Sequence, residues 1–130
     1  MAEKKIILIA DDDVDYLFQM EHYIKSFGYD VIKAQSQKEA EVLIENTNPD
    51  LAIFDLMMEN DDSGFVLCHK MKRRHPDVPI ILATAVASET GMSFGVNSNN
   101  EKQWIKADLY LEKGIRKDQL YKEINKLLKI

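Results

Sequence analysis

The feature that most restricts the fold of this chain is a regular alternation of short apolar runs with amphipathic segments. The apolar runs, whose pattern is typical of strands buried on both faces, lie at 6–10, 31–32, 51–54, 80–83 and 109–111. Apolar residues at spacings of three and four predict helices at 14–27, between Ser36 and Pro49, at 65–74 and from about 116 onward. This alternation indicates an α/β fold in which a parallel five-stranded sheet carries helices on both faces.

Composition excludes several classes of function. The 130 residues suit one domain, so we predict a single domain over 1–130. A formal net charge of −5 disfavours direct binding to nucleic acid, which depends on Lys and Arg contacts with phosphates. Cys68 is the single cysteine, and no paired Cys/His spacing suggests zinc. No apolar run is long enough for a membrane span or a signal peptide, so we expect a cytoplasmic protein without membrane insertion.

Polar residues follow four of the predicted strands, at the edge where a doubly wound sheet binds its ligands. They are Asp11, Asp12 and Asp13 after the first strand, Asp55 after the third, Thr84 after the fourth and Lys113 after the fifth. Carboxylates held close together repel each other unless a cation neutralises them, and Mg²⁺ prefers oxygen ligands of this kind. A metal flanked by a carboxylate, a hydroxyl and a lysine is suited to phosphoryl transfer.

Each of these residues also has a purely structural interpretation. An Asp after a strand is a good helix N-cap, so Asp13 needs no ligand. Thr84 is also an ordinary β-branched strand residue, and Lys113 an ordinary surface charge. By contrast, a charge between apolar neighbours, as at Asp55, is costly unless it is used. Because all of these residues meet at one edge of one sheet, they jointly favour a functional site.

The motifs closely resemble the receiver domain of two-component response regulators over residues 6–128. The segment ILIADDD resembles the family's first strand with its acidic pair, and LAIFDLMM resembles the strand and loop that carry the phosphoacceptor, here Asp55. IILATA places the family's phosphate-contacting hydroxyl at Thr84. ADLYLEK places the family's lysine at Lys113 and its aromatic switch residue at Tyr110.

The resemblance implies a flavodoxin-like (βα)5 fold with strand order 2-1-3-4-5. It also implies that Mg²⁺ is held by Asp12, Asp55 and the backbone carbonyl of Met57, with Asp11 acting through water. Asp55 would accept a phosphoryl group from a histidine kinase or a histidine phosphotransfer protein. The expected product is an aspartyl phosphate.

By the same resemblance, Lys113 and Thr84 would contact the phosphoryl oxygens. Thr84 and Tyr110 would then shift together and reshape a surface that a downstream protein reads. Such a domain is a signalling switch. We expect it to catalyse at most its own phosphoryl transfer and the hydrolysis of its acyl phosphate.

Three segments depart from the family pattern. Glu59 stands where the family has a proline and Gly64 comes one residue late, so we predict a longer loop with Ser63 as the N-cap of the next helix. Gly114 replaces the proline, often in a cis bond, that normally follows the lysine. Glycines and asparagines within 85–106 are poor helix formers, so we expect an atypical fourth helix that is short, displaced or partly unwound.

Two other functions remain open on the sequence. One is a receiver-like interaction module that no longer cycles phosphate, which Gly114 and the altered 59–64 loop favour. The other is a phosphatase with an Asp nucleophile, which needs a second acid two residues further on. Met57 stands at that spacing after Asp55, whereas Asp13 follows Asp11 at that spacing.

Overall fold

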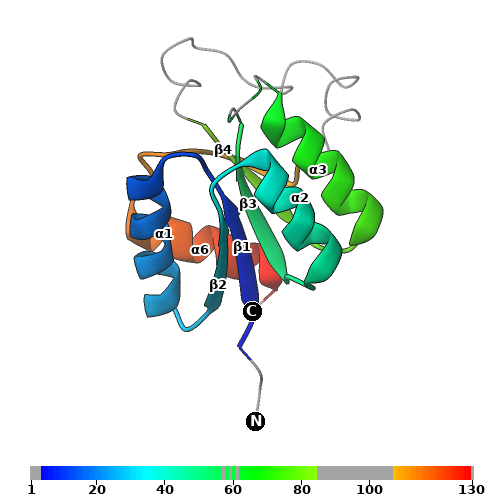
Figure 1. The fold of residues 1–130 in the computed structure, drawn as a ribbon. Helices are drawn as coiled ribbons and strands as arrows, with labels where there is room; N and C mark the ends of the chain where they lie inside the picture. The colour runs from blue at the N-terminus through cyan, green and yellow to red at the C-terminus, as the bar shows by residue number, and fades with distance from the viewer. Residues whose placement is uncertain (1–3, 57, 59, 61, 85–106, 130) are drawn as a thin grey trace, which may run out of the picture.

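The computed structural model describes residues 4–56, 58, 60, 62–84 and 107–129. Its centre is a parallel sheet in the order β2-β1-β3-β4-β5 (Figure 1), which confirms the predicted topology. The strands are β1 (Ile6–Ala10), β2 (Asp30–Ala34), β3 (Leu51–Asp55), β4 (Ile80–Thr84) and β5 (Leu109–Glu112). β2 is longer than its apolar run because it lies at the edge of the sheet, where polar residues can pair with β1 and still face solvent.

Helices cover both faces of this sheet (Figure 1). They are α1 (Val14–Ser26), α2 (Gln37–Asn46), α3 (Ser63–Arg74) and α6 (Lys117–Leu128). α1 and α6 pack on one face against a cluster that includes Ile7 and Ile9, and α2 and α3 pack on the other against a cluster that includes Leu8. Both faces of the central strands are therefore buried, as the continuous apolar runs predicted.

The start of α2 is stabilised by side-chain hydrogen bonds to the backbone. The hydroxyl of Ser36 accepts a hydrogen bond from the N–H of Glu39 at 3.1 Å. The carboxylate of Glu39 in turn accepts one from the N–H of Gln35 at 2.7 Å. Two backbone donors at this end are thus satisfied locally, which fixes where the helix begins.

The prediction that Ser63 caps α3 is wrong. α3 begins at Ser63 itself, and its N-cap residue is Asp62, whose side chain makes no capping hydrogen bond. The fully buried hydroxyl of Ser63 instead donates to Oε1 of Gln37 at 2.8 Å and accepts from the N–H of Asn60 at 3.1 Å. Burial decides this outcome, because a hydroxyl enclosed between two helices must find its partners there.

Aspartate side chains close the amino edge of the sheet. Asp50 accepts a hydrogen bond from the N–H of Ile6, the first residue of β1, at 2.8 Å. Asp108 accepts one from Ile80, the first residue of β4, also at 2.8 Å. Nζ of Lys72 lies 3.0 Å from Oδ2 of Asp108 and donates to a nearby backbone carbonyl at 2.7 Å. Each of these carboxylates therefore accepts a hydrogen bond from the first backbone N–H of a strand, which would otherwise lack a partner at the edge of the sheet.

Several predictions concern residues outside the described ranges. These are the atypical fourth helix in 85–106, the carbonyl of Met57 and part of the 59–64 loop. No peptide bond between described residues is cis, so the bond from Lys113 to Gly114 is trans. In the part of the chain that the structure describes, no helix combines the length and apolar character that crossing a membrane requires.

Candidate phosphoryl-transfer site

The carboxyl edge of the sheet brings together acids that are distant in the sequence. β1 and β3 are neighbours with Ala10 paired to Phe54, so Asp11 and Asp55, the next residues in each strand direction, emerge side by side. α3 starts directly beside the end of β3. A β-carbon at Gly64 would lie 2.7 Å from the carbonyl oxygen of Asp55, so glycine permits this close approach.

Three carboxylates form a cluster at this edge. Oxygen atoms of Asp11, Asp12 and Asp55 all lie within 4.8 Å of one another. Asp11 and Asp55 are buried, with 1% and 6% of their surface exposed, whereas Asp12 is exposed. Asp13 donates its N–H to Oδ1 of Asp11 at 2.9 Å, but its own carboxylate caps α1. That capping role argues against a phosphatase pair made of Asp11 and Asp13.

Lys113 brings a positive charge into this cluster. Its Nζ lies 2.7 Å from Oδ2 of Asp11 and 3.1 Å from Oδ1 of Asp55. Its N–H donates to the carbonyl of Thr84 at 3.1 Å, which fixes the backbone beside β4. Within the described residues, Oδ2 of Asp11 makes no well-directed hydrogen bond, so its partner is the ammonium charge. One cation therefore serves two buried carboxylates.

Burial and mutual repulsion change the pKa values of these groups. Burial, reinforced by the charge of Asp11, raises the pKa of Asp55 from 3.8 to about 6 against the opposing effect of Lys113. Burial also raises the pKa of Asp11, although Lys113 and a backbone N–H oppose the shift. Burial lowers the pKa of Lys113, but its contacts with both carboxylates outweigh that effect and raise it. The single ammonium of Lys113 therefore does not fully offset the negative charge of the carboxylates at this site.

Tyr16 is a site residue that the sequence analysis missed. Nζ of Lys113 lies 4.9 Å from the centroid of the Tyr16 ring, within the range of a cation–π contact. Burial, together with the charges of Asp11 and Asp55, raises the pKa of the Tyr16 phenol, so the ring stays neutral. The available signal was its spacing of seven residues from Tyr23, which places both rings on the same side of α1.

The two predicted switch residues lie on neighbouring strands. Thr84 ends β4 and is buried with 2% exposure. Tyr110 is half-buried, pairs with Leu82 of β4, and packs against the apolar cluster that contains Leu82. Because side chains alternate along a strand, Thr84 and Leu82 share one face of β4. The fold therefore places Thr84 and Tyr110 on the same side of the sheet.

The donor set is suited to a hard divalent cation. Three carboxylates and one ammonium leave a surplus of negative charge, and oxygen ligands at this spacing fit Mg²⁺, which retains several waters. A bound cation would relieve the repulsion that raises the pKa values of Asp11 and Asp55. Chemically, the cluster combines partly desolvated carboxylates with one ammonium group.

Comparison with known proteins identifies the family. The family model for the response regulator receiver domain matches residues 7–125, so the chain belongs to the response regulator receiver domains of two-component systems. The regulatory protein VanR of Enterococcus faecium is 36% identical over 101 residues, covering 75% of this chain and 42% of VanR. A probable transcriptional regulator, ycf27, of Cyanophora paradoxa is 30% identical over 130 residues, covering 97% of this chain and 49% of that protein. The chain spans half or less of the length of these relatives.

Solved structures agree with this assignment. A CheY-like receiver domain protein from Methanospirillum hungatei superimposes with a TM-score of 0.81 at 25% identity, covering 98% of this chain and 95% of that one. The response regulator TrrA from Thermotoga maritima, solved in complex with Mg(2+)-BeF, has a TM-score of 0.77 at 25% identity, covering 95% of this chain and 98% of that one.

Proposed function

We propose that this protein is a phosphoacceptor switch in a two-component phosphorelay, with Asp55 as the acceptor. The observation that carries the proposal is the buried Asp55 carboxylate, which lies in a cluster of acids with Nζ of Lys113 3.1 Å from its Oδ1. Partial desolvation makes this carboxylate a better nucleophile, while the ammonium is positioned to stabilise an incoming phosphoryl group.

Magnesium is the proposed cofactor. Asp12 and Asp55 would bind it directly with the carbonyl of Met57, and Asp11 would act through water. Bound there, Mg²⁺ would offset charge on the phosphoryl oxygens. The spacing of the three carboxylates supports this proposal, as does the Mg(2+)-BeF complex of the similar TrrA structure.

The phosphoryl group would come from a phosphohistidine on a histidine kinase or a histidine phosphotransfer protein. A carboxylate oxygen of Asp55 attacks the phosphorus, so that a P–O bond forms as the P–N bond breaks. The leaving imidazole nitrogen keeps the electron pair and takes up a proton. Lys113 and Thr84 contact the phosphoryl oxygens, which spreads the charge that develops during transfer.

The output of the switch would be a protein contact. Thr84 and Tyr110 share one side of the sheet, so a shift of Thr84 toward a new phosphoryl group leaves room into which Tyr110 can turn. A downstream protein in the cytoplasm would recognise the altered surface. The net charge of −5 makes direct contact with nucleic acid a poor output for this chain.

Intact-mass spectrometry after incubation with acetyl phosphate and Mg²⁺ tests the proposal. We expect one added phosphoryl group, which Asp55→Asn and a chelator both abolish. Asp13→Ser is the matched control, because it changes a neighbouring exposed acid but keeps a good α1 cap, and it should still be labelled. Borohydride reduces an acyl phosphate to an alcohol, so peptide mapping should find the modification at position 55.

The same experiment separates the two receiver interpretations. Absence of labelling under conditions that label an ordinary receiver would contradict the phosphoacceptor proposal. It would favour an interaction module that no longer cycles phosphate. Labelling that persists in Asp55→Asn would move the acceptor to another residue.

A further inference from the structure

A seam of aromatic rings and lysines joins α1 to the segment from Lys113 to α6. Three contacts make up the seam, and their members occur in the same order along α1 with its C-cap Phe27 and along residues 113–121. They are Tyr16 with Lys113 (4.9 Å from Nζ to ring centroid), Tyr23 with Lys117 (5.6 Å) and Phe27 with Tyr121 (4.8 Å between ring centroids). The first contact lies at the acidic cluster, and the last lies at the opposite end of α1.

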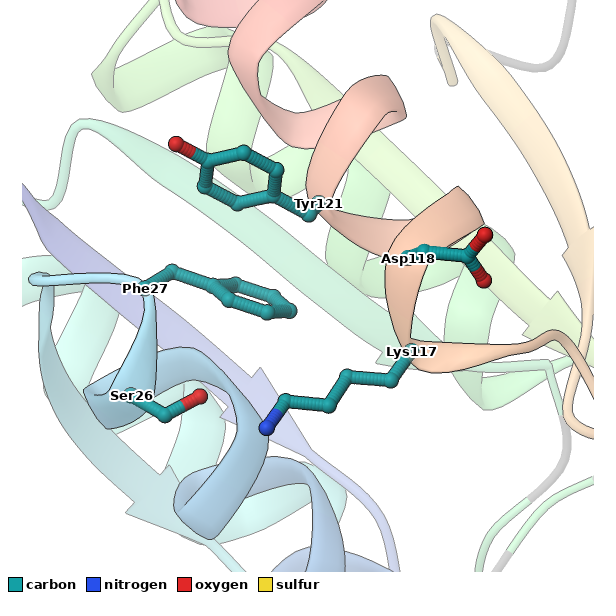
Figure 2. Close-up of a pocket in the computed structure, with 5 residues that line it drawn as sticks. All are labelled: Ser26, Phe27, Lys117, Asp118 and Tyr121. Atoms are coloured by element: carbon teal, nitrogen blue, oxygen red, sulfur yellow. The ribbon is translucent and has the colours of Figure 1, made fainter.

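Helical spacing explains part of the seam. Tyr16, Tyr23 and Phe27 follow one another at intervals of seven and four residues, which places them along one side of α1 and its C-terminal end. Lys117 and Tyr121 lie four residues apart in α6, and Lys113 lies in the turn between β5 and α6. Figure 2 shows the end distant from the acids, where Lys117 extends toward α1 and the rings of Phe27 and Tyr121 lie beside each other. These residues line a surface pocket together with Ser26 and Asp118.

The contact at Tyr16 differs from the rest of the seam in what its lysine touches. Lys113 contacts two buried carboxylates on one side and the Tyr16 ring on the other. The Lys113 side chain is only 19% exposed, and the attraction between a cation and a ring face grows when water is excluded. The ring thus limits how far the ammonium can move away from Asp11 and Asp55.

The backbone at Lys113 is restrained by hydrogen bonds, but these bonds do not reach its side chain. Gly114 occupies the place of the proline that the receiver pattern predicts, and a β-carbon there would meet no atom within 4 Å. The N–H of Lys113 donates to the carbonyl of Thr84 at 3.1 Å, and the N–H of Ile115 donates to the carbonyl of Glu112 at 3.1 Å across the turn. The position of its long side chain is therefore determined by the groups around the ammonium.

We propose that Tyr16 is a positioning residue that holds the ammonium of Lys113 beside Asp55 through its ring face. The inference rests on the proposed function, because the benefit is an ammonium already in place when a phosphoryl group arrives. The ring, and not the phenol hydroxyl, performs this role. Phe at position 16 should therefore substitute for Tyr, and Leu should not.

Nuclear magnetic resonance tests the contact directly in the full chain. In the wild type, the ring current of Tyr16 should shift the Lys113 ε-methylene protons upfield. We expect Tyr16→Leu to abolish that shift and Tyr16→Phe to retain it. Tyr23→Leu is the matched control, since it removes the next ring of the same seam, which faces Lys117. A Lys113 shift that survives in Tyr16→Leu overturns the proposal.

Phosphorylation kinetics with acetyl phosphate and Mg²⁺ test the consequence. From the usual strength of a partly desolvated cation–π contact, we expect labelling of Tyr16→Leu to be about two- to fivefold slower. Tyr16→Phe and Tyr23→Leu should react like the wild type. Equal slowing in Tyr23→Leu would show a general packing effect, and equal slowing in Tyr16→Phe would assign the effect to the hydroxyl. Either result overturns the proposal.

Failure of the two proposals can be distinguished. If the wild type is never labelled, the proposed function fails, and the resonance of Lys113 still decides whether Tyr16 holds its ammonium. If the wild type is labelled and Tyr16→Leu keeps both its rate and its Lys113 shift, the proposed function survives and the positioning role fails. Melting temperatures of all three variants identify any variant that has lost its fold.

Discussion

Two edges of the same sheet each carry a lysine paired with aspartate, but the charges are arranged differently. At the amino edge, Lys72 meets one carboxylate, Asp108, which also accepts a strand N–H. At the carboxyl edge, Lys113 meets the carboxylates of Asp11 and Asp55, with Asp12 nearby. The first arrangement is balanced, whereas the second has a surplus of negative charge.

The difference gives a testable criterion for separating acids that complete the fold from acids that would bind a ligand. A carboxylate whose oxygens accept hydrogen bonds from strand donors completes the structure and needs no ligand. A carboxylate buried beside other carboxylates destabilises the folded protein when no cation is bound, because the negative charges repel each other. A bound cation removes that repulsion and stabilises the folded protein. The predictions below test this contrast between the Lys72 and Lys113 edges.

The largest expected effect is on the phosphorylation rate, in a comparison of two single variants, Lys113→Met and Lys72→Met. Lys113→Met should slow phosphorylation by acetyl phosphate on the order of a hundredfold, because it removes a charge aimed at the transferred group. Lys72→Met, at the balanced edge, should leave the rate unchanged and affect only stability. Comparable rates for the two variants in timed intact-mass measurements would remove the functional distinction between the edges.

Magnesium affinity should depend on the acids of the carboxyl edge. Asp12→Ala should raise the Mg²⁺ dissociation constant at least about tenfold, since even groups one step further from a metal often have effects of that size. Asp15→Ala serves as control, because Asp15 is an exposed acid in the first turn of α1 outside the three-carboxylate cluster. Isothermal titration calorimetry measures both. An unchanged constant in Asp12→Ala would contradict the proposed ligand set.

Stability without metal should fall as pH rises through the acid range. The raised pKa of Asp55, about 6 in the folded state against 3.8 ordinarily, means that ionising this group costs more in the folded protein. Its stabilising contribution is therefore complete below pH ~4 and is lost by pH ~6, with a slope of at most about 1.4 kcal/mol per pH unit for one proton.

Urea unfolding in a chelator at several pH values measures this dependence. Asp55→Asn should flatten the slope between pH 4 and 6, and Asp108→Asn should not. A slope that is equally steep in Asp55→Asn would assign the pH dependence to other groups.

The smallest expected effect lies at the amino edge. Asp108→Ala leaves the N–H of Ile80 without its acceptor and should lower the free energy of unfolding by about 1–2 kcal/mol. Asp118→Ala is the control, since its pair with Arg116 is highly exposed and contributes little. Thermal melts compare the two. An equal loss in both variants would show that capping the strand donor is unimportant.

Much of the fold was predictable because both faces of the central strands are buried. Continuous apolar runs identified β1, β3 and β4, and the residue that follows each run identified a member of the site edge. Parallel pairing then determines which edge the acids share, so their proximity followed from topology alone. The chemical roles of these residues stay predictions.

Other features depend on three-dimensional contacts that a sequence does not specify. Asp62 and Ser63 are both acceptable caps by residue type, and the burial of Ser63 against Gln37 decided between them. Tyr16 lies on a helix far in sequence from Lys113, and their contact depends on how α1 packs beside the segment that follows β5. Residue type and spacing contain no information on that packing.

The close approach of α3 to β3 has a consequence for mutational surveys of this protein. A scan of all single substitutions should find Gly64 as intolerant as Asp55, although the reason at Gly64 is steric. Gly64→Ala would push a methyl group into the backbone of β3 and lower protein abundance, whereas Asp55→Asn should abolish signalling at normal abundance. Gly114, with open space around it, should accept alanine. A position near this site that tolerates no substitution can therefore be assigned a chemical role only if protein abundance is measured separately from activity.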